Sequence, residues 1–204
     1  MTLSHLTSQI PGDGPTSPLS AEHYQAMRDA KTKRSKIDVA IGVATFNGWS
    51  LGLFATLSGL LLLLSFSLIG LVISLGLGAV AYYEFKGRAM LRQLDASGAR
   101  LLGYNQLALG ALIVGYCLWS LIAAMVGPSP YAETIEQNPE LAQMLGSTDE
   151  LFRFGAFIVY GMGIVLTIPY QALVAWFYFS RAKHIIHYVN QTPQWVTQIQ
   201  KAAA

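Results

Sequence analysis

Long uncharged stretches alternate with short charged segments along this chain. The first stretch runs from Val39 to Tyr83, 45 residues without Asp, Glu, Lys or Arg. A single helix of that length would be about 68 Å long, whereas the hydrocarbon core of a bilayer is about 30 Å thick and takes about 20 residues. We therefore expect two membrane crossings, over about 40–64 and 68–83, joined by a turn at Ser65–Ser67.

Two further uncharged stretches predict two more crossings. The third span covers about 101–126 and should end before Pro128, because proline lacks the N–H of the next helical turn. The fourth covers about 154–180, and Pro169 within it predicts a kink whose freed carbonyls Gln171 is placed to satisfy. The expected fold is all-α: a polytopic integral membrane protein with four transmembrane helices and short flanking helices.

The polar segments divide the chain into three regions. Residues 1–36 predict a flexible tail followed by a basic helix, and their polarity argues against a cleaved signal peptide. Residues 37–180 form the four-helix transmembrane domain, with a connector over 84–100 and an outer loop over 127–153. Residues 181–204 form a C-terminal tail that begins as an extension of the fourth helix.

Capping signals predict how the outer loop is folded. Asn138 with Pro139 is typical of a helix start, and Gly146 suits the end of that helix. Ser147 with Glu150 matches a capping box, which would open the fourth helix after a break.

The connector and the C-terminal tail carry simpler signals. The connector should continue the second helix and lie on lipid headgroups, with its turn at Asp95–Gly98. In the tail, Trp195, Val196 and Ile199 predict an amphipathic turn that touches the membrane interface.

Composition and charge agree with a membrane protein and orient it. Hydrophobic residues make up 53% of the chain and charged residues 12%, against about 25% charged in a soluble domain. Of the 13 Lys and Arg residues, only Arg153 falls on the outer-loop side of the predicted spans. By the positive-inside rule we expect both termini in the cytoplasm, in a bacterial inner (cytoplasmic) membrane. The net charge of +2 is too small to predict a nucleic-acid partner, and one cysteine excludes a disulfide scaffold.

Polar side chains inside the predicted spans are neutral. No Asp, Glu, Lys or Arg lies deep in any span, which argues against a proton-coupled carrier, because such proteins use intramembrane ionisable groups. The candidate intramembrane polar contacts are the amides Asn47, Asn105, Gln106 and Gln171, which could join helices by hydrogen bonds or line a polar site.

Motifs for chemistry are missing from the sequence. Nucleotide-binding loops, zinc-protease motifs and nucleophile elbows are all absent. His184 and His187 are spaced like metal ligands, yet no Cys, Asp or Glu lies nearby to complete a site. We therefore expect no catalytic residues, no metal and no cofactor.

Small residues recur every four positions in the first two spans. Gly48 and Gly52 lie in the first, and Gly70, Ser74 and Gly78 lie in the second. Such stripes let helices approach closely, either within the first hairpin or against another copy or partner.

These patterns favour a non-catalytic role. We expect an accessory, scaffold or assembly subunit of a membrane complex, or a small homo-oligomer, whose partners are the lipid bilayer and other membrane subunits or itself. A channel or carrier for a small neutral solute, built around the amides, is the first alternative. A subunit that binds a quinone, a pigment or a lipid is the second.

Overall fold

Helices account for nearly all of the described residues. The computed structural model describes residues 19–65, 68–127, 140 and 142–203, and these contain no strand. The helices are α1 (Ala21–Ser65), α2 (Leu68–Arg92), α3 (Ala96–Val126), α5 (Ala142–Gln191) and α6 (Gln194–Ala202). Among the described residues, the first four of these are long and apolar enough to cross a membrane. The expected all-α, four-span fold is confirmed.

The break after the first span and the end of the third span fall where the sequence places them. α1 ends at Ser65 and α2 begins at Leu68, while the turn residues 66 and 67 lie outside the described part of the chain. α3 ends at Val126, before Pro128. The helices themselves are longer than the spans, because the basic segment before the first span is continuous with it and α1 reaches 45 residues.

The predicted break before the fourth span is wrong. α5 begins at Ala142 and continues for 50 residues, so Gly146 and Ser147 lie inside a helix instead of at its boundary. A glycine in a helix interior costs only about 1 kcal/mol, which is less than the backbone hydrogen bonds that a break would remove. The predicted helix start at Asn138 and Pro139 lies outside the described residues.

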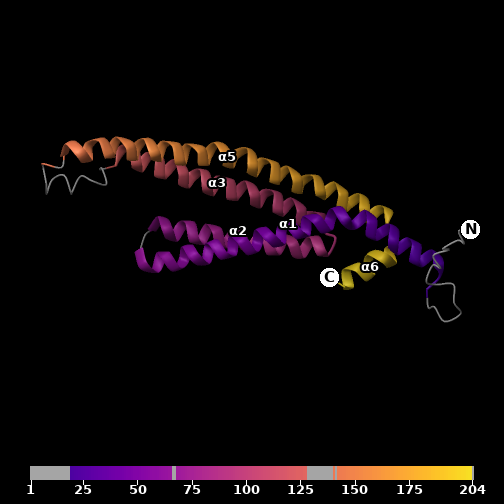
Figure 1. The fold of residues 1–204 in the computed structure, drawn as a ribbon. Coiled ribbons are helices and arrows are strands. Elements are labelled where there is room, and N and C mark those ends of the chain that lie inside the picture. The colour runs from indigo at the N-terminus through magenta and orange to yellow at the C-terminus, as the bar shows by residue number, and fades with distance from the viewer. Residues whose placement is uncertain (1–18, 66–67, 128–139, 141, 204) are drawn as a thin grey trace, which may run out of the picture.

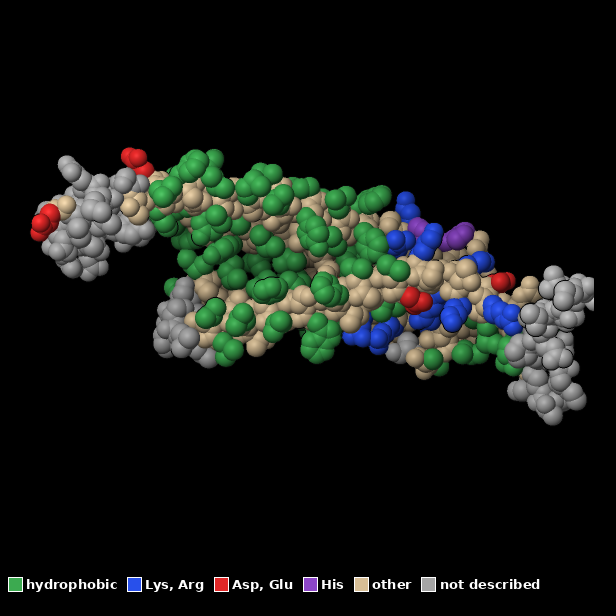
Figure 2. All heavy atoms as spheres, viewed as in Figure 1, with side chains coloured by type: hydrophobic (Ala, Val, Ile, Leu, Met, Phe, Trp, Pro, Cys, Tyr) green, Lys and Arg blue, Asp and Glu red, His purple; other side chains and the backbone are tan. Residues whose placement is uncertain are grey.

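The long helices form two hairpins that are joined at one end. Figure 1 shows α1 beside α2 and α3 beside α5, with the two pairs converging at one end of the molecule and separating at the other. Figure 2 shows Lys and Arg side chains gathered over the half where the pairs converge, and hydrophobic side chains over the other half. We call the convergent half the basic end and the other the opposite end.

The buried core lies at the basic end. It consists of buried side chains from several helices that pack together: Ala30, Ile37, Ala40, Ala44, Leu91, Leu94, Ala99, Leu102, Tyr178, Ala182, Ile185, Tyr188 and Val196. In the most apolar window of each spanning helix, by contrast, only 6% to 17% of the residues are buried. Water drives apolar side chains together, whereas lipid does not, so this distribution fits helices whose apolar surfaces face lipid over the rest of their length.

A tight turn joins α2 to α3 at the basic end. The backbone N–H groups of Leu94 and Asp95 donate to the carbonyls of Leu91 and Met90, which is the Schellman pattern, with Leu94 at φ 57°. The Asp95 carboxylate then caps α3 by accepting hydrogen bonds from the Ser97 backbone N–H at 2.8 Å and the Ser97 hydroxyl at 2.7 Å. The predicted turn at Asp95–Gly98 is therefore shifted, because Asp95 already serves as the N-cap of α3.

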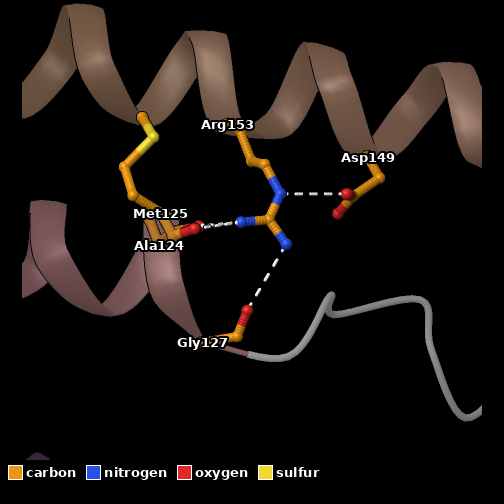
Figure 3. Close-up of polar contacts among 5 residues, drawn as sticks. All are labelled: Ala124, Met125, Gly127, Asp149 and Arg153. Carbon is orange, nitrogen blue, oxygen red and sulfur yellow. Dashed lines mark hydrogen bonds and ion pairs between the residues drawn. The ribbon is translucent and has the colours of Figure 1, made fainter.

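Arg153 fastens α5 to the end of α3 at the opposite end of the bundle (Figure 3). Its guanidinium donates to the carbonyls of Ala124 at 3.0 Å and Met125 at 2.6 Å, and to Gly127 at 3.4 Å. Its Nε forms an ion pair with Asp149 at 3.0 Å. A positive charge at a helix C-terminus satisfies carbonyls that have no helical partner, which explains this basic residue on the acidic side.

α6 folds back onto the core at the basic end. Val196 is buried, Trp195 meets the His23 ring of α1 at a centroid distance of 5.1 Å, and the Tyr188 hydroxyl donates to Gln200 at 2.7 Å. Of the three residues expected to form an interfacial turn, two thus pack against protein, and Ile199 remains exposed.

Candidate functional site

A layer of polar side chains crosses the bundle where the two hairpins meet. It consists of Asn47 from α1, Glu84 from α2, Asn105 and Gln106 from α3, and Tyr178 from α5, and we call it the polar layer. Every membrane-spanning helix contributes to it.

Two glycines bring the helices close together at this level. A Cβ on Gly48 would lie 3.1 Å from the Phe85 ring and 3.4 Å from the Glu84 Cβ, so a side chain here would force the neighbouring residues of α2 to give way by a few tenths of an ångström. A Cβ on Gly103 would lie 2.6 Å from the Phe179 ring, which has the same consequence for α3 and α5.

Glu84 is the centre of the polar layer. Its side chain is 0% exposed, and its Oε1 accepts hydrogen bonds from Gln106 Nε2 at 2.6 Å and Asn105 Nδ2 at 3.0 Å. Asn105 Nδ2 also donates to the Val80 carbonyl at 3.0 Å, which fixes the amide against α2. The other carboxyl oxygen, Oε2, is buried without a hydrogen-bond partner.

The position of Glu84 corrects the expectation that no acidic or basic residue lies inside the bundle. The sequence places it one residue beyond the second span, at the start of the connector. In the structure α2 continues without interruption to Arg92. Glu84 lies 16 residues after Leu68, about 24 Å along the helix, which is within the thickness of a hydrocarbon core of about 30 Å.

Tyr178 and Asn47 approach Glu84 from the other helices. The Tyr178 side chain is fully buried and its hydroxyl interacts electrostatically with Glu84. Asn47 lies beside that hydroxyl, outside good hydrogen-bond geometry, so the Tyr178 oxygen is a second buried polar atom without a partner. Two unpartnered oxygens, one from each hairpin, thus lie in the same interior region.

The structure brings together three of the four amides predicted from the sequence. Asn47, Asn105 and Gln106 belong to the polar layer. Gln171 lies about two helical turns before Tyr178 on α5. A Cβ on Gly110 would lie 3.2 Å from the Gln171 Cβ, and the Gln171 Oε1 is buried without a partner. α5 passes through Pro169 as one helix, and among the described residues no hydrogen bond joins Gln171 to a carbonyl freed there.

The predicted small-residue stripes meet different surroundings. Gly48 packs against α2, as described above, whereas a Cβ on Gly52 or Gly78 would meet nothing within 4 Å. Gly70 is half-buried, and the Ser74 hydroxyl is buried without a partner.

Other close glycine contacts between helices lie outside these stripes, and the sequence analysis did not find them. The tightest is on α2, where a Cβ on Gly87 would lie 2.5 Å from the Leu102 side chain of α3. On α3, Gly103 and Gly110 are seven residues apart and face Phe179 and Gln171 of α5, and Cys117 seven residues later faces Gly163. A seven-residue spacing is the signal that a left-handed helix pair leaves in a sequence, so a search with that period would have found these positions.

Two apolar grooves lie between α2 and the α3–α5 pair at the opposite end. One, of about 670 Å³, is lined by residues of α2, α3 and α5, including Ile69, Trp119 and Gly155. The other, of about 410 Å³, shares Ile69 and Trp119 and adds Gly115 among residues of α2 and α3. Figure 2 shows a hollow lined by hydrophobic side chains between the two hairpins in this half.

Metal-ligating side chains are dispersed over the described residues. These contain no group of three or more His, Cys, Asp or Glu side chains that could hold a metal ion. The His184 ring nitrogen Nδ1 lies 3.0 Å from the Ser180 carbonyl, within its own helix.

Comparison of the chain with protein-family models, curated proteins and solved structures finds no match. The polar layer and the apolar grooves are therefore the two features from which function can be argued.

Proposed function

We propose that this chain is a non-catalytic membrane protein that serves as an accessory or assembly subunit, and that a transmembrane helix of a neighbouring subunit docks in the apolar grooves. The observation that carries the proposal is the separation of the two hairpins at the opposite end. There, α2 and the α3–α5 pair line two apolar grooves of about 670 and 410 Å³.

The lining of the grooves favours a helix as occupant. It includes the small residues Ala111, Gly115, Ala123, Ala124, Gly155 and Ala156. A Cβ on Gly115 or Gly155 would meet nothing within 4 Å, so the bundle itself does not use the close approach that these glycines allow. Small residues are what membrane helices present to one another, and Trp119 offers a large apolar contact beside them.

The proposed setting is a bacterial cytoplasmic membrane with both termini in the cytoplasm. The basic end carries the start of α1, the α2–α3 turn and the end of α5, and Arg153 on the opposite end is occupied by α3 carbonyls and Asp149. Positive charge retained on one side supports this orientation.

Site-specific photocrosslinking tests the docking proposal. A photoreactive amino acid at Trp119, activated in native membranes, should give crosslinked species heavier than the 22.2 kDa chain by the mass of a protein. Their mass also distinguishes another copy from a different subunit. The substitution Gly115→Leu in the same chain should reduce the yield severalfold, because a Cβ at this position meets nothing within 4 Å and the longer side chain occupies the groove that Gly115 lines.

Gly42→Leu is the matched control. A Cβ on Gly42 also meets nothing within 4 Å, but Gly42 lies on α1 outside both grooves. It should leave the yield unchanged. Crosslinks to lipid alone would contradict the proposal and favour a lipid-binding subunit. An equal loss of crosslinking yield with Gly115→Leu and Gly42→Leu would also contradict the docking proposal.

The polar layer favours a second candidate function, a carrier for a small solute. Asn105 and Gln106 are oriented by Glu84, and Asn47 and Tyr178 complete a polar cross-section at one level of the bundle. Flux of a solute into vesicles containing the protein, abolished by Asn105→Leu, would support this candidate over the first.

A further inference from the structure

The hydrogen bonds around Glu84 are those of a neutral carboxylic acid. One oxygen accepts from two amides, and the other is buried and accepts from none. A carbonyl oxygen has two lone pairs, which these two amides fill, whereas an ionised carboxylate offers about four acceptor positions over both oxygens. An ionised Glu84 would leave the positions on Oε2 empty in a place that excludes water, at high free-energy cost.

Compensating positive charge does not reach the carboxyl group. Among the described residues, no ion pair joins Glu84 to a Lys, Arg or His side chain, and the two ion pairs found are Arg34–Asp38 and Arg153–Asp149. We propose that Glu84 is a proton-binding site: the folded protein holds a proton on Oε2, inside the membrane-spanning bundle, at the junction of the two hairpins.

The nearest titratable group from the other hairpin makes no hydrogen bond to Oε2. A protonated Oε2 becomes a hydroxyl donor. The buried Tyr178 hydroxyl of α5 interacts electrostatically with Glu84, but both oxygens lack a hydrogen-bond partner among the described residues. The proton therefore stabilises the site by removing a buried negative charge, and no oxidant or other reactant is needed.

Charged groups near the layer lie toward the basic end. From the other helices Glu84 faces one titratable group among the described residues, the Tyr178 hydroxyl. That hydroxyl also interacts electrostatically with Tyr170, about two turns earlier on α5. The nearest charged residues along the four helices are Asp38 on α1, Lys86 and Arg88 on α2, Arg100 on α3 and Arg181 on α5. Lys86 lies over the Tyr83 ring at 5.9 Å and Arg181 over the Phe177 ring at 4.5 Å, so both are directed elsewhere.

Infrared spectroscopy of the full-length protein in lipid vesicles tests the proposal. At neutral pH, where exposed carboxyl groups are ionised, the spectrum should contain the carbonyl band of one protonated carboxylic acid. Glu84→Gln should remove this band, and the exposed Glu22→Gln, which changes the formal charge equally, should retain it.

Thermal unfolding of the same samples separates a bound proton from a bound metal cation. The glutamine of Glu84→Gln has the shape and hydrogen bonds of the protonated acid, so we expect an unfolding temperature equal to or above that of the wild type. A spectrum without the band, or a band that survives Glu84→Gln, would overturn the proposal. So would a wild-type unfolding temperature that rises with Na⁺ or K⁺, compared with choline, and no longer does so in Glu84→Gln.

Discussion

At Leu94 the side chain and the backbone make opposite demands. The side chain is 4% exposed and belongs to the core at the basic end, which favours a large apolar residue. The backbone has φ 57°, a left-handed conformation that costs a residue with a Cβ about 1–2 kcal/mol and costs glycine nothing. At this Schellman turn, burial of the Leu94 side chain therefore outweighs the cost of its left-handed backbone.

Substitutions at Leu94 should separate these two effects. We expect Leu94→Ala to lower the free energy of unfolding by about 2–4 kcal/mol, because it loses burial and keeps the strain. Leu94→Gly should be more stable than Leu94→Ala by about 1 kcal/mol, the reverse of the usual helical order. Denaturant titration of the purified protein measures both, and an alanine variant more stable than the glycine variant would contradict the turn geometry.

Asp95 should make stability depend on pH at the same turn. Hydrogen bonds from the Ser97 hydroxyl and backbone N–H lower the pKa of Asp95 below its ordinary value. Its contribution to stability is therefore complete above the pKa of the unfolded chain, about 3.9, and decreases as pH falls through the lower pKa of the folded state.

Unfolding measured from neutral pH down to about pH 3 checks this dependence. Asp95→Asn should lower stability at neutral pH and remove part of the acid sensitivity. The exposed Asp29→Asn serves as the control for a lost negative charge and should retain the wild-type profile. Identical profiles for the wild type and Asp95→Asn would show that the cap has no energetic role.

At the scale of elements, glycine spacing decides how α3 packs on α5. Gly103, Gly110 and the Cys117–Gly163 contact place the closest approaches seven residues apart on α3. Between membrane helices, where burial from water does not drive association, close backbone approach is a principal source of affinity.

Alanine substitutions test this packing. Gly103→Ala should destabilise the protein by about 1–3 kcal/mol, because the new Cβ would lie 2.6 Å from the Phe179 ring. Gly42→Ala meets open space and should be neutral or stabilising by up to about 1 kcal/mol through helix propensity. Unfolding in a titration with denaturing detergent compares the two, and an equal effect would indicate that the ring moves aside without cost.

Helix type and most helix ends could be predicted from the sequence. Charge or proline interrupts the apolar runs near Arg92 and Val126, and the break at Ser65 follows from an uncharged stretch too long for one crossing. The continuity of α5 through Gly146 could not be predicted, since a capping box is only a local preference, and the hydrogen bonds of a continuous helix outweigh the cost of one interior glycine. The Arg153 contact was missed for a related reason: its carbonyl partners lie 26 to 29 residues away.

For the whole molecule, the asymmetry of charge predicts its orientation. Cys117 is the only cysteine and is buried, so introduced cysteines report with little background. In intact cells an impermeant maleimide should label Glu140→Cys, which is exposed at the opposite end. It should label Gln198→Cys, exposed on α6, only after the membrane is opened. The reverse pattern would invert the proposed topology.

The polar layer shows what whole-molecule arrangement adds to the sequence. Asn105 and Gln106 were recognised because amides stand out in an apolar run. Glu84 was not, because Lys86 and Arg88 follow it closely and made it look like part of a solvated connector. Only the packing of α3 against α2 shows that the Glu84 carboxyl group points into the bundle.

The length of α5 has a mechanical consequence. Its 50 residues span about 75 Å, more than twice the thickness of a hydrocarbon core, and it continues as one helix from the Arg153 contact to the core that holds α6. If the helix tilts as a unit, a tilt of about 5° displaces one tip by about 6 Å relative to the other. A helix that docks between the hairpins at the opposite end would therefore shift α6 at the basic end.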